Sequence, residues 1–126
     1  MRKLAHEVQL VGRQGYAVLS EPRTEADMLQ EVIEKAIEDK AIVRFVYGGH
    51  QRVIEPHVLG ISAGVMQILG YQIEGSSSSG TLPEWRRFDL EKIIGMEVTA
   101  QTFSGRRPFP SGRHSSWDRQ ILIVGV

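Results

Sequence analysis

The sequence contains no cysteine, so it has no disulfide framework, no thiolate nucleophile and no thiolate metal site. It contains no run of about 18 apolar residues, so we expect no membrane-spanning helix. The charged residues at the start are followed by no apolar stretch, so we expect no signal peptide and a cytoplasmic protein. Fifteen basic and fifteen acidic side chains cancel. Net charge therefore gives no argument for binding to nucleic acid or membranes, although local charge can.

Motifs for catalysis and metal binding are also missing. No glycine-rich phosphate loop is present, and no serine lies in a nucleophile-elbow sequence. The four histidines, at positions 6, 50, 57 and 114, lack the spacing of a metal site. The carboxylates gather on one helix, away from the expected strands, with no pair facing a common cleft. We therefore expect no enzyme, no cofactor and no metal.

A length of 126 residues suits one domain, or one domain with a tail. We divide the chain into residues 1–23, residues 24–103 and residues 104–126. In the first part, two short apolar runs flank Gly12–Gly15, which indicates either a hairpin or a loosely held N-terminal arm. The second part holds one helix and most of the strands.

Residues 24–40 have the pattern of an amphipathic helix. Thr24 is a plausible N-cap and Asp27 completes a capping box. One face is apolar, with Met28, Leu29, Val32, Ile33, Ala36 and Ile37. Six acids minus two bases give this segment a net charge of −4. The acidic side is either a docking face or a solvated outer surface.

Short β-rich runs fill residues 41–75 and 85–98, with turn residues between them. Pro56 lacks an amide hydrogen, so it belongs at a strand end, an edge or a bulge. Residues 65–73 place apolar side chains on both faces, which indicates a central or wrapped strand. Residues 75–80 form a Gly- and Ser-rich loop. The expected fold class is mainly β with one N-terminal helix (α+β), arranged as a small sheet or barrel.

The last part of the chain differs in composition. Residues 104–126 are rich in Gly, Pro and Arg, and four arginines against Asp118 give a net charge of +3. They end in the very apolar run Ile121–Val126. We expect this run to form a strand that joins the sheet or pairs with a second chain, because such a strand is rarely left in water.

Basic and aromatic residues alternate along the expected strands. Arginine can pair with phosphate through two parallel hydrogen bonds, and aromatic rings can stack on bases. We therefore single out these residues as candidates for ligand binding: Arg44, Arg52, Arg86, Arg87 and Lys92 for phosphate, and Tyr71 and Trp85 for stacking.

Taken in order, these segments resemble a WYL domain over about residues 29–103. The strand Arg52–Pro56, with Leu59 three residues beyond the proline, resembles the family pattern Arg-x-x-x-Pro-x-x-Leu. Residues 86–93 resemble Arg-x-Phe-Arg-Leu-Asp-Arg-Ile, and Phe103 suits the phenylalanine that closes the pattern. The sequence departs from the family where Met66-Gln67-Ile68 replaces Trp-Tyr-Leu, and where Asp89 and Lys92 replace two arginines.

The resemblance implies a five-stranded SH3- or Sm-like barrel. It also implies a ligand-sensing module of bacterial transcription regulators, often found behind a winged helix-turn-helix, several of which bind nucleic acid or nucleotide-like ligands. The residues that carry over most directly are Arg52, Arg86 and Lys92. The chain offers no second helix for a helix-turn-helix, so we expect it to regulate through a partner protein or to act as a free-standing binder.

Two functional hypotheses follow. The first is a ligand-binding regulatory module that holds a nucleotide-like ligand or single-stranded nucleic acid through basic residues on strands. The second is a protein-interaction or dimerisation module that has lost the family ligand site, with a homodimer formed through the C-terminal strand.

Overall fold

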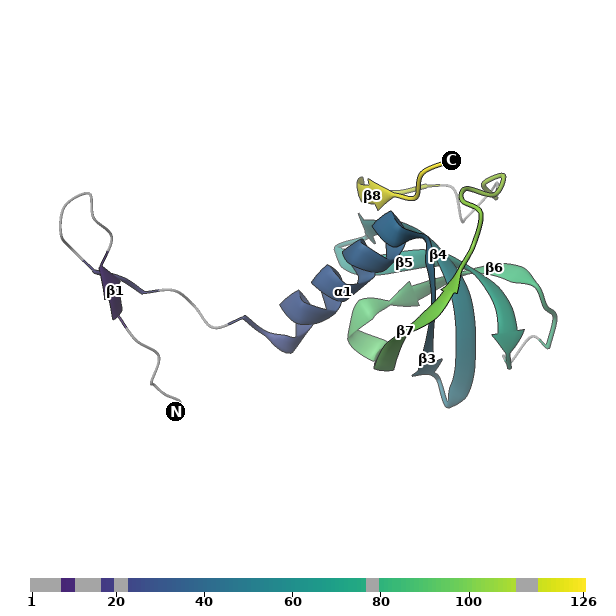
Figure 1. Ribbon diagram of the computed structural model, residues 1–126, viewed down its shortest axis with the longest axis horizontal. Helices are drawn as coiled ribbons and strands as arrows, with labels where there is room; N and C mark the ends of the chain where they lie inside the picture. The colour runs from purple at the N-terminus through teal and green to yellow at the C-terminus, as the bar shows by residue number, and fades with distance from the viewer. Residues whose placement is uncertain (1–7, 11–16, 20–22, 77–79, 111–115) are drawn as a thin grey trace.

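The computed structural model describes residues 8–10, 17–19, 23–76, 80–110 and 116–126, and shows a mainly β protein with one α-helix (Figure 1). No helix in these ranges is both long enough and apolar enough to cross a membrane. The elements are β1 (Val8–Leu10), β2 (Ala17–Leu19), α1 (Glu25–Asp39), β3 (Ala41–Tyr47), β4 (His50–Ser62), β5 (Val65–Gly75), β6 (Glu84–Asp89), the 3-10 turn η1 (Leu90–Lys92), β7 (Ile94–Thr102) and β8 (Arg119–Ile123).

Strands β1 and β2 pair with each other in an antiparallel ladder, in which Val8 lies opposite Leu19 and Leu10 opposite Ala17. The turn predicted at Gly12–Gly15 lies outside the described residues.

Helix α1 begins where the capping residues predict. The Thr24 hydroxyl oxygen accepts a hydrogen bond from the Asp27 amide at 3.0 Å, and an Asp27 carboxylate oxygen accepts one from the Thr24 amide at 3.2 Å. The helix ends at Lys40, whose φ of 54° is left-handed. Ile33, Ala36 and Ile37 are buried as predicted, whereas Met28 and Val32 remain exposed. The buried face of the helix is thus narrower than the apolar face that the sequence predicts.

The larger sheet is antiparallel, with the strand order β6-β5-β4-β3-β7 and with β8 paired to β4. Among the residues that the structure describes, no pairing joins β6 to β7, so the sheet is open in its hydrogen bonding. The structure thus shows an antiparallel sheet, the coarser part of the predicted barrel.

Strand β4 is long because it serves two partners along one edge. Its first half pairs with β3 as far as Ile54, and its second half pairs with β8 from Val58 onward. On the other edge, the register with β5 shifts between Pro56 and Val58. Pro56 therefore lies at a bulge, as predicted, where the missing amide hydrogen breaks no ladder bond.

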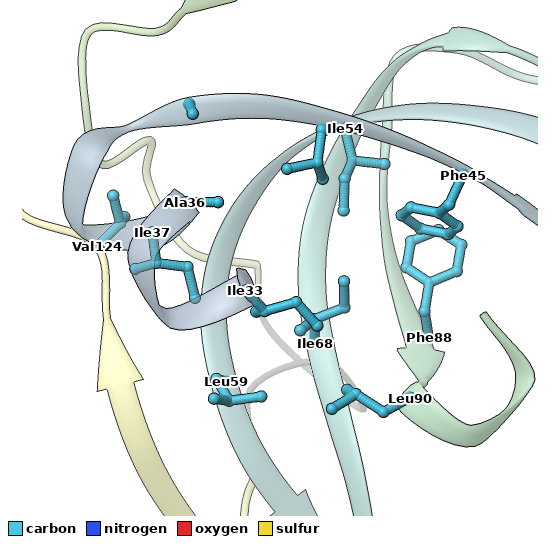
Figure 2. Packing of buried hydrophobic residues seen from close by; sticks show 12 residues of the cluster. Ile33, Ala36, Ile37, Phe45, Ile54, Leu59, Ile68, Phe88, Leu90 and Val124 are labelled. Carbon is cyan, nitrogen blue, oxygen red and sulfur yellow. The ribbon is translucent and has the colours of Figure 1, made fainter. Parts of the chain in front are cut away.

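Strand β5 is central and wrapped, as its two apolar faces predict. It lies between β4 and β6, and both Ile68 and Leu69 are buried although neighbouring residues point to opposite faces. The core on the helix side runs from Ile33 and Ile37 of α1 to the rings of Phe45 and Phe88 (Figure 2).

The C-terminal run joins the sheet. Ile123 lies opposite Val58, the Val124 amide donates to the His57 carbonyl oxygen at 2.8 Å, and the Val124 side chain is fully buried in the core. This is one of the two outcomes expected for an apolar strand at this position.

Candidate functional site

Strand alternation separates the predicted site residues between two faces of the sheet. Arg86 lies opposite Gly70, and the next pair along the same two strands is Trp85 and Tyr71. Successive side chains point to opposite faces, so Arg86 shares the core-facing side with Phe88. Tyr71, Trp85 and Arg87 share the outer face. The seven residues therefore do not gather at one place.

Arg52 and Arg86 belong to the core-facing side. The side chain of Arg52 donates from Nε and Nη2 to the Tyr47 carbonyl oxygen at 3.3 and 3.0 Å, and from Nη1 to Oε1 of Gln72 at 3.2 Å. Its guanidinium lies 5.8 Å from the centre of the Tyr47 ring and 5.6 Å from that of Phe88. Arg52 thus closes the end of the core that lies away from α1.

A second guanidinium lies beside this buried one. Arg86 pairs with Glu84 at 2.8 Å. The pKa of Arg52 is lowered from its usual value, first by burial and then by repulsion from Arg86, while Tyr47 and Glu84 act in the opposite direction. We call Arg52, Gln72, Glu84 and Arg86 the core-facing arginine site. Among the described residues, the site brings the guanidinium groups of Arg52 and Arg86 together with the Glu84 carboxylate.

The outer face holds an aromatic cluster. The Tyr71 and Trp85 rings lie 5.2 Å apart, and the His57 ring lies edge-on to Trp85 at 4.8 Å and stacks on Phe103 at 5.3 Å. The Arg107 guanidinium lies 4.3 Å from the centre of the Tyr71 ring. The Trp85 ring lies 6.2 Å from that of Phe109, so both predicted stacking residues contact the protein's own C-terminal segment.

His57 joins this segment to the sheet through both ring nitrogens. Nε2 accepts a hydrogen bond from the Arg107 amide at 3.2 Å, so Nδ1 carries the proton and donates to the Glu55 carbonyl oxygen at 2.8 Å. Burial lowers the pKa of His57 most, and Arg107 and Arg106 add to the lowering against the raising effect of Glu55. The imidazole is therefore neutral at pH 7.

Arg87 extends the outer face toward the C-terminus. Its guanidinium lies 3.8 Å from the centre of the Trp117 ring, and it donates to Oε1 of Gln67 at 3.3 Å and to the Ser116 carbonyl oxygen. Burial lowers the pKa of Arg87. The residue helps to hold Ser116 and Trp117 against the sheet.

Arg44 and Lys92 each form an ion pair with a neighbouring carboxylate. Arg44 pairs with Glu97 on β7 at 2.9 Å, which raises the pKa of Arg44 and lowers that of Glu97. Lys92 lies 3.5 Å from Asp89 and its side chain is 63% exposed. Both are ion pairs at the solvated surface, where water screens the attraction between the charges.

The larger cleft in the surface does not coincide with the seven predicted site residues. A cleft of about 580 Å³ lies between the first turn of α1, the turn before β5 and η1, and none of the seven residues lines it. A hollow of about 300 Å³ beside β7 includes Arg44 and Arg52 in its wall. In the described ranges, no three His, Asp or Glu side chains lie close enough together to hold a metal ion.

Sequence reasoning missed Glu55, His57 and Arg107. Each belongs to the outer face, and each depends on a segment that returns to β4 from about 50 residues away. The only local signal is the run Arg106-Arg107-Pro108-Phe109, which repeats the mixture of basic and aromatic residues noted on the strands.

No protein-family model matches the sequence, and no curated protein matches it significantly. Among solved structures, the chain is similar to proteasome accessory factor B/C (PafBC) of Arthrobacter aurescens, with 22% identity and a TM-score of 0.54. The match covers 72% of this chain and 15% of that one, so this chain spans a small part of PafBC. The two proteins therefore share a fold over the matched region.

Proposed function

We propose that this chain is a non-enzymatic, ligand-binding regulatory module that holds a phosphate-bearing ligand at the core-facing arginine site. The ligand class is a nucleotide-like molecule or single-stranded nucleic acid. The observation that carries the proposal is Arg52, which is 4% exposed and whose hydrogen bonds, among the described residues, all go to neutral oxygens. The resemblance to WYL domains and their barrel supports the same function.

The charge balance of this site favours an anion. Burying the Arg52 guanidinium is costly, and repulsion from Arg86 adds to that cost while attraction to Glu84, which pairs with Arg86, offsets part of it. A phosphate oxygen near both guanidinium groups would relieve that repulsion and accept charge-assisted hydrogen bonds. Lys92, exposed at the end of η1, would extend the contact along a nucleic acid backbone.

The test is fluorescence anisotropy with short labelled single-stranded DNA and RNA, and with a labelled mononucleotide, at low and physiological salt. The variant is Arg86→Gln, and the matched control is Arg23→Gln, which removes an arginine from a solvated pair with Glu31 on α1. For single-stranded DNA, losing one phosphate contact should make the slope of log K against log salt concentration less steep by about 0.7. The control should bind as the unmodified protein does.

Two results would contradict the proposal. One is the absence of binding to all three probes at low salt. The other is binding by Arg86→Gln with unchanged affinity and salt dependence, provided that circular dichroism shows that the variant is folded.

The second candidate function, protein interaction, is favoured by a different observation. Four large apolar side chains are exposed on α1 and β7, two elements that pack together: Met28, Val32, Ile94 and Val98. Exposed apolar surface of this kind is typical of an interface. A substitution on this surface leaves the core intact. Deletion of residues 120–126, which would test a dimer through the C-terminal strand, would also remove Val124 from the core.

For this candidate we expect Val98→Lys to lower the mass measured by light scattering. The control is Val126→Lys at the exposed end of the chain. A protein that is monomeric at every concentration before mutation would rule out a homodimer through this surface.

A further inference from the structure

Glu55 is a carboxylate that the fold has buried on the outer face, with its side chain only 6% exposed. It precedes Pro56 at the bulge of β4, where the β3 ladder has ended and the β8 ladder has not begun. A carboxylate in such a place is costly unless a cation and hydrogen bonds compensate it. The compensating cation is Arg107.

The pair has the geometry of planar recognition. Arg107 donates from Nε to Oε1 of Glu55 at 2.7 Å and from Nη2 to Oε2 at 3.1 Å, so both carboxylate oxygens are used. The Tyr71 ring lies against the same guanidinium, 4.3 Å from its carbon atom. A carboxylate at the edge and an aromatic ring on the face together select a guanidinium over an ammonium.

The two sides of the pair differ in where they come from. Glu55 and Tyr71 lie opposite each other on β4 and β5 in the middle of the sheet. Arg107 comes from the segment after β7, and its side chain is 44% exposed. The receptor is thus built into the sheet, whereas the cation approaches it from the solvent side.

We infer that Glu55 and Tyr71 form a guanidinium-binding site. Arg107 fills this site in cis, and an arginine side chain of another molecule can fill it in trans when Arg107 is absent. The site is independent of the core-facing arginine site, because it lies on the opposite face of the sheet and takes a cation instead of an anion.

The site can be emptied without removing the segment that covers it. Arg106 donates from Nε and Nη2 to the Val124 carbonyl oxygen at 3.1 and 2.8 Å, and its amide donates to the Gly125 carbonyl oxygen at 2.9 Å. The Arg107 amide still donates to His57 after truncation of the side chain. Arg107→Ala should therefore leave an open site with an unpaired carboxylate.

The test is thermal unfolding of Arg107→Ala with 100 mM N-acetyl-arginine amide, with N-acetyl-lysine amide at the same concentration as the control. Both compounds carry one positive charge, and only the first has a guanidinium. We expect the arginine derivative to raise Tm by about 2–5 °C more than the lysine derivative. This difference should vanish in the unmodified protein and in Arg107→Ala combined with Glu55→Gln.

Equal shifts with the two derivatives would overturn the inference, as would an arginine-specific shift that persists without the Glu55 carboxylate. If Arg107→Ala does not fold, Arg107→Gln is measured in the same way. An arginine-specific rise in Tm for that variant supports the site, and its absence overturns it.

Discussion

At the scale of single residues, His57 is a titratable side chain that the fold removes from water. Its side chain is fully buried, and its pKa is lowered mainly for that reason. As pH falls, the unfolded chain takes up a proton at the ordinary histidine pKa of about 6.5, before the folded chain does. The stabilisation is therefore complete above about pH 6.5 and is lost as pH falls from there through the lowered pKa.

We predict that the free energy of unfolding declines between pH 7 and pH 5, and that His57→Gln reduces this decline. Urea unfolding at several pH values measures both proteins, with His50→Gln as the control for a histidine that bonds to Ser76 near the surface. A decline of the same size in His57→Gln would show that other groups cause it.

Part of this residue-level picture is accessible from sequence. Pro56 predicts a bulge because its ring removes a hydrogen-bond donor, which is a local property. The aromatic and basic character of Tyr71, Trp85 and Arg86 is local too. The partnership of Glu55 with Arg107 is not, because no periodicity relates residues 52 positions apart.

At the scale of the elements, the N-terminus of α1 is specified by its capping residues. Because the Thr24 hydroxyl satisfies an otherwise open amide, we predict that Thr24→Ala destabilises the protein by about 1 kcal/mol. Thr24→Ser keeps the oxygen and should stay close to the unmodified protein in thermal unfolding. Equal losses in the two variants would mean that the methyl group, and not the cap, matters.

The elements were predictable where their signals are local. Helix α1 and strand β3 lie where hydrophobic periodicity and the capping residues place them. The sequence predicts a strand at Arg52–Pro56, but β4 runs from His50 to Ser62, because the bulge at Pro56 does not end the strand. Strand β7 extends to Thr102, beyond the expected end at Val98, because pairing with β3 outweighs the polar composition of its last residues.

At the scale of the whole molecule, the pairing of β8 with β4 depends on the absence of a side chain at Gly60. A Cβ atom at Gly60 would lie 2.6 Å from the Arg119 carbonyl oxygen and 2.6 Å from the Trp117 ring. We predict that Gly60→Ala lifts β8 from β4, with a cost of about 1–3 kcal/mol. Faster hydrogen exchange at Ile121 and Ile123 than at β5 amides would report this.

The matched control is Gly60→Ala combined with Trp117→Ala, which removes one of the two clashes. Unchanged exchange at β8 in the single variant would contradict the close approach. The composition of residues 104–126 predicted a strand at their end, but it could not predict which edge of the sheet receives it, since that is decided by pairing between residues 65 positions apart, from Val58 to Ile123.

The dependence of β4 on β8 also has a consequence for biosynthesis. When β4 leaves the ribosome, the residues that complete its second half have not yet been made, and at roughly 5–20 residues per second the delay is several seconds. During that time the second half of β4, including Leu59, has no β8 to pair with. The nascent chain therefore exposes an unpaired, apolar strand edge. Slower translation of the codons for residues 104–126 should therefore increase the fraction of chains captured by chaperones.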